Sequence, residues 1–255
     1  MLLAVDIGNT NTGFGVWDGA SLRSGWRCET RDARTEDEYL VLLGGLFSRA
    51  GLDLGRVTAG IISSVVPPAT APVERFFSRA LRLVPHVVGP DTRTGLQVLY
   101  ENPRELGPDR LVNAVAANGR FPQGAVVVDF GTATKFDVVT DRGEYAGGII
   151  APGLAVAAEA LVGATARLPR IELRPPARAI GRTTLGSLQS GLVLGYSALV
   201  EGLLARIRAE LSFVPKVIAT GGLAASIAAE CPSIEQVDPQ LTLEGLRILH
   251  ERNGS

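Results

Sequence analysis

Lysine, cysteine and histidine are all scarce in this chain of 255 residues. Lysine and arginine together number 25, yet only Lys135 and Lys216 are lysines, so phosphate chemistry has almost no lysine to draw on. The two cysteines, Cys28 and Cys231, lie far apart without metal-ligand spacing, which indicates reduced thiols in a cytoplasmic protein. Two distant histidines cannot form a histidine-based metal centre.

Signals for export, membranes and nucleic acid are also missing. The first five residues are apolar, but Asp6 follows them and no basic residue precedes them, so we expect no signal peptide. Residues 185–205 are the stretch most like a membrane span, but glycine, serine and glutamine dilute their hydrophobicity. We expect a buried helix packed closely on protein, with a subunit interface as one possible setting, and no membrane. The net charge of −1 argues against a nucleic-acid partner.

Strand and helix patterns alternate along the chain, which has an apolar fraction of 46%. Thr35 and Glu38 form a capping-box pattern before apolar residues at helical spacing. Short β-branched or apolar runs predict strands, at residues 2–5, 13–17, 57–66, 86–88, 125–128, 136–139 and 216–219. Helical spacing predicts helices, at residues 73–83, 109–117, 154–161 and 185–211. The sequence therefore predicts an α/β protein.

One unit of sequence occurs twice. Asp6, Gly8, Val16 and Asp18 recur as Asp129, Gly131, Val139 and Asp141, each 123 positions later. Each copy reads as a buried strand, an acidic turn and a second strand. A repeat at half the chain length predicts two related subdomains, which we expect to span residues 1–118 and 119–255 without a flexible linker.

The two acidic turns suit phosphate binding. An Asp that ends a buried strand can hold hydrated Mg²⁺, while Gly and Thr residues offer amides and hydroxyls to phosphate oxygens. Either turn alone is equally typical of an ordinary hairpin. The duplication, together with a later turn at Thr220, Gly221 and Gly222, favours the phosphate interpretation.

Competing nucleotide motifs fail. Gly8 and Gly13 have P-loop spacing, but Phe14 stands where the P-loop lysine belongs. Gly13 and Gly15 are followed by Asp18 instead of the small residue that a dinucleotide fingerprint requires.

Four segments carry a resemblance to a known family. They are Asp6-Ile7-Gly8-Asn9-Thr10-Asn11, Gly107-Pro108-Asp109-Arg110, Asp129-Phe130-Gly131-Thr132-Ala133-Thr134 and Gly147-Gly148-Ile149-Ile150-Ala151-Pro152-Gly153. In this order, they closely resemble type III pantothenate kinase, a member of the acetate and sugar kinase, heat-shock chaperone and actin superfamily. The resemblance implies two duplicated RNase H-like (actin-like ATPase) subdomains, each a mixed sheet flanked by helices.

The resemblance also implies an activity. It is the ATP-dependent phosphorylation of pantothenate to 4′-phosphopantothenate, the first step of coenzyme A biosynthesis, with Mg²⁺, a monovalent cation (K⁺ or NH₄⁺) and a cytoplasmic homodimer. An alternative is a non-catalytic regulatory protein of the transcriptional accessory type on the same fold. A nucleotide switch like actin or a chaperone is a third interpretation, but it gives no reason for the segment around Asp109.

The resemblance assigns roles to individual residues. Asp109 matches the catalytic base, Asp129 the monovalent-cation site, and Asp6 the Mg²⁺ site, with the ion held through water. The ATP-binding positions are Asp6, Ile7, Gly8, Asn9, Thr10, Asn11, Thr12, Gly13, Thr132, Gly221 and Gly222. The substrate-binding positions are Tyr100, Gly107, Pro108, Asp109, Arg110 and Thr184, the last of them contributed across a dimer interface.

From the residue types alone, each of these positions can also have an ordinary structural role. Asp109 can stabilise a helix N-terminus through its dipole. Arg110, a plausible counter-charge for the pantothenate carboxylate, can be an ordinary exposed arginine. Tyr100 can be a core aromatic residue and Thr184 a helix cap.

Two positions depart from the family pattern. Pro108 replaces a small residue and lacks an amide donor. Lys135 replaces a threonine, and its side chain either approaches the phosphates or, as we expect, points outward. Elsewhere, a basic stretch opposed mainly by Glu172 reads as a solvated loop, and its arginines are Arg167, Arg170, Arg174, Arg178 and Arg182.

Overall fold

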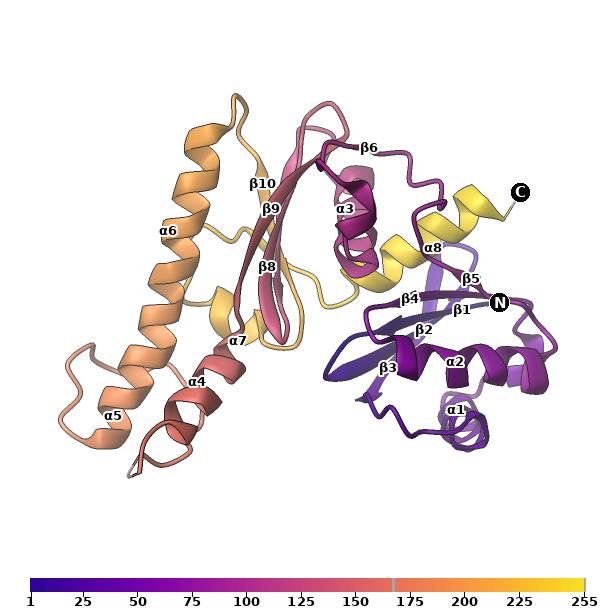
Figure 1. The fold of residues 1–255 in the computed structure, drawn as a ribbon, viewed down its shortest axis with the longest axis horizontal. Helices are drawn as coiled ribbons and strands as arrows, with labels where there is room; N and C mark the ends of the chain where they lie inside the picture. The colour runs from indigo at the N-terminus through magenta and orange to yellow at the C-terminus, as the bar shows by residue number, and fades with distance from the viewer. Residues whose placement is uncertain (167, 255) are drawn as a thin grey trace. The chain divides into compact units, whose positions relative to one another are not determined.

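The structure is a computed structural model that describes residues 1–166 and 168–254. It divides into two compact units, each built on its own sheet (Figure 1). Unit 1 comprises Met1–Leu96, Tyr100–Ala116 and Gln240–Ser255, and unit 2 comprises Gln97–Leu99 and Ala117–Pro239. The expected halves were contiguous, whereas the last helix, beyond residue 240, groups with unit 1.

Unit 1 contains a mixed sheet in the order β3-β2-β1-β4-β5. Its strands are β1 (Leu2–Ile7), β2 (Asn11–Asp18), β3 (Ser21–Glu29), β4 (Ala59–Ser64) and β5 (His86–Val87). β1 pairs antiparallel with β2 and parallel with β4. The helices of this part of the chain are α1 (Glu36–Arg49), α2 (Pro67–Phe76), α3 (Pro108–Arg120) and α8 (Leu241–Asn253), and α3 continues into unit 2.

Two helix beginnings show how local sequence fixes these elements. The predicted capping box is present, because the Thr35 hydroxyl accepts from the Glu38 amide and the Glu38 carboxylate accepts from the Thr35 amide. α2 begins at Pro67, earlier than the predicted residue 73, and the two prolines occupy its first positions. Proline is favoured there, because the first helical amides have no partner within the helix. The prolines thus start the helix shortly after β4 ends at Ser64.

The sheet of unit 1 is covered on both faces. Alternate residues of β1, including Leu3 and Val5, pack with apolar residues of α1 and α2. Leu2 and Ala4 face the other way and pack with residues of α3 and α8, such as Val112 and Leu246. Asp6 therefore lies on the α3 and α8 face, where β1 ends.

Unit 2 repeats the sheet of unit 1. Its order is β11-β10-β7-β8-β9-β6, so β9-β8-β7-β10-β11 corresponds to β3-β2-β1-β4-β5. The strands are β6 (Gln97–Val98), β7 (Ala125–Phe130), β8 (Ala133–Val139), β9 (Glu144–Pro152), β10 (Lys216–Thr220) and β11 (Gln236–Val237). β1 and β7 share one burial pattern, in which the half-buried position is Asp6 in one and Asp129 in the other. The predicted duplication and mixed α/β fold are confirmed.

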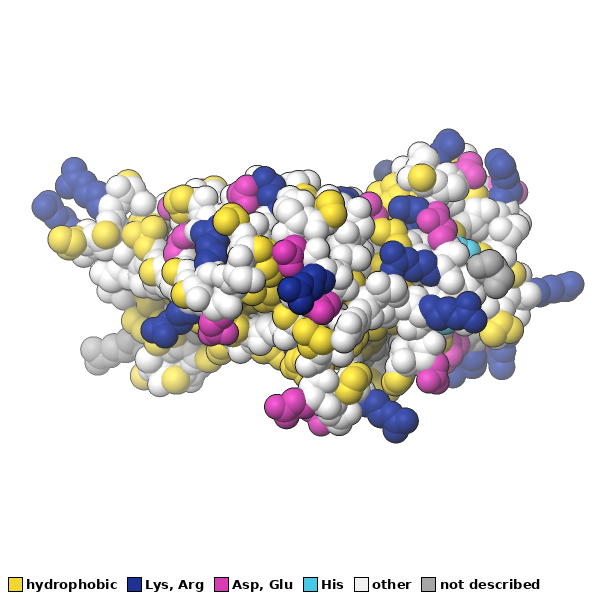
Figure 2. Space-filling model, turned by 90° about the horizontal axis from the view of Figure 1, so that it is seen from above, with side chains coloured by type: hydrophobic (Ala, Val, Ile, Leu, Met, Phe, Trp, Pro, Cys, Tyr) yellow, Lys and Arg dark blue, Asp and Glu magenta, His cyan; other side chains and the backbone are white. Residues whose placement is uncertain are grey.

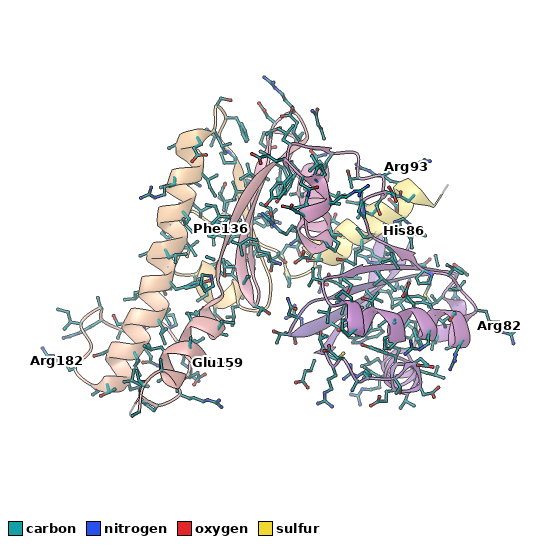
Figure 3. The ribbon with its side chains drawn as sticks, viewed as in Figure 1. Arg82, His86, Arg93, Phe136, Glu159 and Arg182 are labelled. Atoms are coloured by element: carbon teal, nitrogen blue, oxygen red, sulfur yellow. The ribbon has the colours of Figure 1, made fainter. Side chains whose placement is uncertain are left out.

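Helices cover one face of this second sheet (Figure 1). They are α4 (Leu154–Gly163), α5 (Thr184–Gln189), α6 (Gly195–Glu210) and α7 (Ala224–Ala228), with a π turn between α5 and α6. Phe136 of β8 packs in the same cluster as Val200 and Leu204 of α6, and its side chain lies on the α6 side of the sheet (Figure 3). Val126 and Val128 of β7 join this core.

The long apolar helix differs from its prediction. By length and composition, Thr184–Glu210 is the one helical stretch among the described residues that could cross a membrane, a test that core helices of soluble proteins also pass. Only 28% of its most apolar window is buried within the chain. Leu185 and Leu199 are exposed, so the expectation of a buried helix is wrong for the single chain.

The cysteines and the basic stretch agree with what the sequence predicts. Cys28 and Cys231 are free, and burial raises the pKa of the Cys231 thiol, which favours the unreactive protonated form. Arg170, Arg174, Arg178 and Arg182 are exposed, as expected for a solvated loop, while Arg167 lies outside the described residues. Acidic and basic side chains are interspersed on the face that Figure 2 presents.

Candidate functional site

The first acidic turn is held by a threonine network in unit 1. The Gly8 amide donates to the Asn11 carbonyl at 3.0 Å, which closes the turn between β1 and β2. The Thr30 hydroxyl donates to the Gly8 carbonyl at 2.7 Å and lies 2.9 Å from the Thr12 hydroxyl. Thr12 is fully buried, whereas Asn9, Thr10 and Asn11 are exposed at the tip. The tip therefore offers its polar groups to a ligand, while the buried threonine secures its base.

Asp6 faces an open position at the end of β1. Its cross-strand neighbours are Gly13 on β2 and Ser63 on β4. A Cβ atom added at Gly13 would meet nothing within 4 Å, so there is space beside the Asp6 side of the sheet. The buried Ser63 hydroxyl has no hydrogen-bond partner in the structure. A carboxylate, free space and an unused hydroxyl are suited to a hydrated cation.

Asp109 lies in the first turn of α3, also in unit 1. Gly107 precedes the helix, and a Cβ there would lie 2.7 Å from an Asp109 carboxylate oxygen and 3.9 Å from the Val65 side chain. The Val65 amide donates to the Ile7 carbonyl at 3.1 Å. These contacts put the Asp109 segment at the edge where β1 and β4 end, which is the edge that carries Asp6.

Pro108 does not weaken the hydrogen bonding of this helix start. It is the first residue of α3, and the Leu111 amide bonds to the Gly107 carbonyl at 3.2 Å. An amide at the first helical position has no partner within the helix, so the missing donor breaks no intrahelical bond. The fixed φ of the ring also suits the helix start.

Arg110 is buried, contrary to its reading as an ordinary exposed arginine. Its side chain is 5% exposed, and its Nη1 donates to the Tyr100 hydroxyl at 3.4 Å. The guanidinium carbon also lies 5.9 Å from the centroid of the Tyr100 ring. A buried guanidinium is a strong recognition group for a carboxylate, because little water competes for its donors. The structure thus brings Tyr100 and Arg110 together.

In unit 2, the turns after β7, β9 and β10 approach one another closely at two glycines, Gly153 and Gly221. A Cβ at Gly153 would lie 2.3 Å from the Thr132 carbonyl oxygen, and one at Gly221 would lie 2.6 Å from the Phe130 carbonyl oxygen. Gly221 also has a φ of +96°, in the region that favours glycine. Thr132 and Gly222 are exposed beside these contacts. Only glycine lets the turns after β7, β9 and β10 approach so closely.

Asp129 and Lys135 form an ion pair that the sequence interpretation missed. They are directly opposite in the β7–β8 pair, and Lys135 Nζ lies 2.9 Å from Asp129 Oδ2. Each side chain is 15% exposed, so the expected outward lysine is wrong. The duplication alone does not predict this pair, because the offset of 123 carries Gly13, which is opposite Asp6, to Phe136, whereas Lys135 is the residue opposite Asp129.

Thr184 is the first residue of α5 and is exposed, so it is not the helix cap. The cap is Thr183, whose hydroxyl accepts from the Gly186 amide at 3.0 Å. Thr184 is therefore not needed to cap the helix.

Comparisons with known proteins match this chain over nearly all of its length. The family model for type III pantothenate kinase matches residues 2–206. A type III pantothenate kinase from Anaeromyxobacter sp. (strain Fw109-5) is 54% identical over 253 residues, which cover 99% of this chain and 100% of the relative.

Solved structures with low sequence identity share the fold. A protein provisionally assigned as a Baf family transcriptional activator, from Campylobacter jejuni, has a TM-score of 0.62 at 18% identity and covers 99% of this chain and 98% of its own. The activator of 2-hydroxyisocaproyl-CoA dehydratase from Clostridium difficile, with bound ADPNP, has a TM-score of 0.54 at 12% identity, covering 96% and 91%. The family match and the high identity over the full length establish that this chain belongs to the type III pantothenate kinase family.

Proposed function

We propose that this protein transfers the γ-phosphoryl group of ATP to the primary hydroxyl of pantothenate, giving 4′-phosphopantothenate in the first step of coenzyme A biosynthesis. The observation that carries the proposal is the position of Asp109 at the strand edge that also carries Asp6, in a chain of this family. One carboxylate can act on a hydroxyl there while the other serves the phosphate side.

Asp109 is proposed as the general base. It would accept the proton of the substrate hydroxyl as that oxygen attacks phosphorus. Asp109 lies in the first turn of α3, where the helix dipole interacts favourably with a negative charge. Gly107 gives the carboxylate room to lie back over the helix start.

Asp6 is proposed to hold Mg²⁺ through water. The space beside Gly13 and the unused Ser63 hydroxyl fit a hydrated ion. Among the described residues, no group of three or more His, Cys, Asp or Glu side chains could hold a metal, which fits an ion carried mainly by phosphates and water. Bound there, Mg²⁺ would neutralise charge on the phosphates. The turn from Gly8 to Thr10 would donate amides and hydroxyls to phosphate oxygens.

The other proposed contacts divide into two groups. Thr132, Gly221 and Gly222 would contact the nucleotide, because Thr132 and Gly222 are exposed and Gly221 lets the turn after β10 pack against the turn after β7. Arg110 would bind the pantothenate carboxylate and Tyr100 would orient Arg110. Gly107, Pro108 and Thr184 complete the proposed substrate positions.

The site for the monovalent cation, K⁺ or NH₄⁺, already contains a positively charged side chain. The family resemblance assigns it to Asp129, where it would have to share the carboxylate with the Lys135 ammonium group. A cytoplasmic location is proposed as well, in agreement with two free thiols.

A direct assay tests the proposed function. We expect the purified protein to consume ATP only when pantothenate and Mg²⁺ are both present, and chelation of the metal should stop turnover. Product is measured by chromatography of the phosphorylated acceptor. Absence of pantothenate-dependent turnover would favour the regulatory alternative on the same fold.

We also propose that the protein is a homodimer formed through the apolar helices of unit 2. Val156, Leu161, Leu185 and Leu199 are exposed on α4, α5 and α6, and an apolar surface of this kind indicates a protein contact.

Leu199→Glu should convert the dimer to a monomer, because the new carboxylate would be buried without a partner. Light scattering coupled to gel filtration measures the mass. Val214→Glu is the matched control: Val214 is 85% exposed on a loop, and its substitution should leave the mass unchanged. A monomeric parent protein, or a Leu199→Glu variant that remains dimeric, would contradict this interface.

A further inference from the structure

We propose that Lys135 supplies the positive charge beside Asp129 that other members of the family would take from a monovalent cation, so turnover does not depend on K⁺ or NH₄⁺. The inference rests on the proposed kinase function and concerns how its second acidic turn is neutralised. It makes one of the two lysines of the chain a tethered ammonium ion.

The sheet determines which way Lys135 points. Phe136, the next residue of β8, faces the core on the α6 side (Figure 3). Successive side chains of a strand alternate, so Lys135 lies on the opposite face. Asp129 is its direct cross-strand partner and shares that face. Lys135 Nζ consequently meets Asp129 Oδ2 at 2.9 Å.

The carboxylate is enclosed on both sides. Oδ2 faces Lys135, while Oδ1 lies 2.7 Å from where a Cβ of Gly221 would be, against the turn after β10. With each side chain 15% exposed, solvent screens this region far less than an open surface. A second cation on the same carboxylate would be repelled by the ammonium group at short range. A monovalent ion therefore does not fit beside Asp129 while Lys135 remains there.

The ammonium group can replace the ion chemically. It carries the same single charge as K⁺ and has the donor chemistry of NH₄⁺, with N–H groups for nearby oxygens. Because it is attached to the chain, it is always present at high effective concentration, and no ion need be captured from solution. Threonine, the usual family residue at this position, carries no charge and could not take this role.

The second lysine offers a matched control. Lys216 begins β10 in the same unit and pairs with Glu235 at 2.5 Å. Its side chain is 34% exposed and its partner's is 40% exposed, so this pair lies in a more open setting. Lys216→Met removes a lysine and an ion pair from unit 2 without changing the Asp129 carboxylate.

The test compares KCl with choline chloride at equal ionic strength and measures product by chromatography, without a coupling enzyme that has its own cation requirement. Wild-type protein and Lys216→Met should turn over equally in both salts. Lys135→Thr should lose roughly tenfold in choline, the scale for a lost charged hydrogen bond, and recover in KCl. Lys135→Arg keeps the charge and should remain independent of K⁺.

Thermal melting without substrates supplies a readout separate from activity. The melting temperature of wild-type protein should be the same in the two salts, whereas KCl should stabilise Lys135→Thr, because an ion that binds only the folded state raises its stability. Lys135→Arg keeps the test usable if Lys135→Thr does not fold.

Two outcomes would overturn the inference. The first is wild-type turnover that disappears in choline and returns with KCl. The second is a Lys135→Thr variant with a raised KM for ATP that is identical in both salts, which would make Lys135 a nucleotide contact. If no protein shows pantothenate-dependent turnover in either salt, the proposed function fails, and the melting comparison still decides the cation question.

Discussion

Asp109→Asn is expected to fold normally and to lose roughly 10²–10⁴-fold in kcat, the usual contribution of a positioned general base. Asparagine has nearly the same shape, so it fits the space that Gly107 leaves beside the helix start. It cannot accept a proton at neutral pH, and the hydroxyl would have to attack without a base. The loss of a charge at the helix dipole should cost only about 0.3–1 kcal/mol of stability.

Steady-state kinetics and thermal melting measure the two parts of this prediction. The KM for pantothenate should change much less than kcat, because Arg110 and Tyr100 remain in place. Glu105→Gln is the control: Glu105 is an exposed carboxylate of the same segment, and its bond with Asn102 can be kept by the amide oxygen. Near-wild-type kcat in Asp109→Asn would remove Asp109 from the mechanism.

The second large effect is expected at Gly221. Gly221→Ala would place a methyl group 2.6 Å from the Phe130 carbonyl oxygen and 2.7 Å from Asp129 Oδ1, at a φ of +96°. The crowded atoms belong to a backbone and to a carboxylate in an ion pair, so the turn itself must move. Overpacking and backbone strain of this kind cost about 1–3 kcal/mol each.

We expect the melting temperature of Gly221→Ala to fall by on the order of 5 °C, given the size of the chain. The KM for ATP should rise by roughly tenfold for each 1.4 kcal/mol that the displaced turn costs binding. Gly45→Ala adds the same methyl group to an exposed position of α1 with nothing within 4 Å, and it should not destabilise the protein. If Gly221→Ala melts and binds ATP like the wild type, the close approach of these turns has no functional importance.

Much of the fold followed from local sequence. The offset of 123 between Asp6 and Asp129 predicted the duplication, and both strands that precede these residues are present. The capping box at Thr35 fixed the start of α1. Such features depend on hydrogen bonds and side chains close in sequence, so they can be recognised from a short segment.

Other elements were not predicted because their sequence pattern is weak. Neither β3 nor β9 was predicted as a strand. Residues of β3 alternate between exposed and half-buried positions, and those of β9 are mostly exposed or half-buried, so neither strand has a continuous apolar run. Their place at the outer side of β2 and β8 is what stabilises them. α8, near the end of the chain, groups with unit 1, and no local motif predicts this long-range association.

In the candidate site too, some features follow from local sequence and others depend on the tertiary structure. The sequence by itself determined which acidic residues follow the repeated strands and put Asp109 at a helix start, since strand ends and helix beginnings have local signals. Only the tertiary structure decided that Arg110 is buried against Tyr100 and that Lys135 turns inward to Asp129. Burial depends on what packs above a residue. The face on which a strand residue lies depends on a register that a one-residue slip would invert.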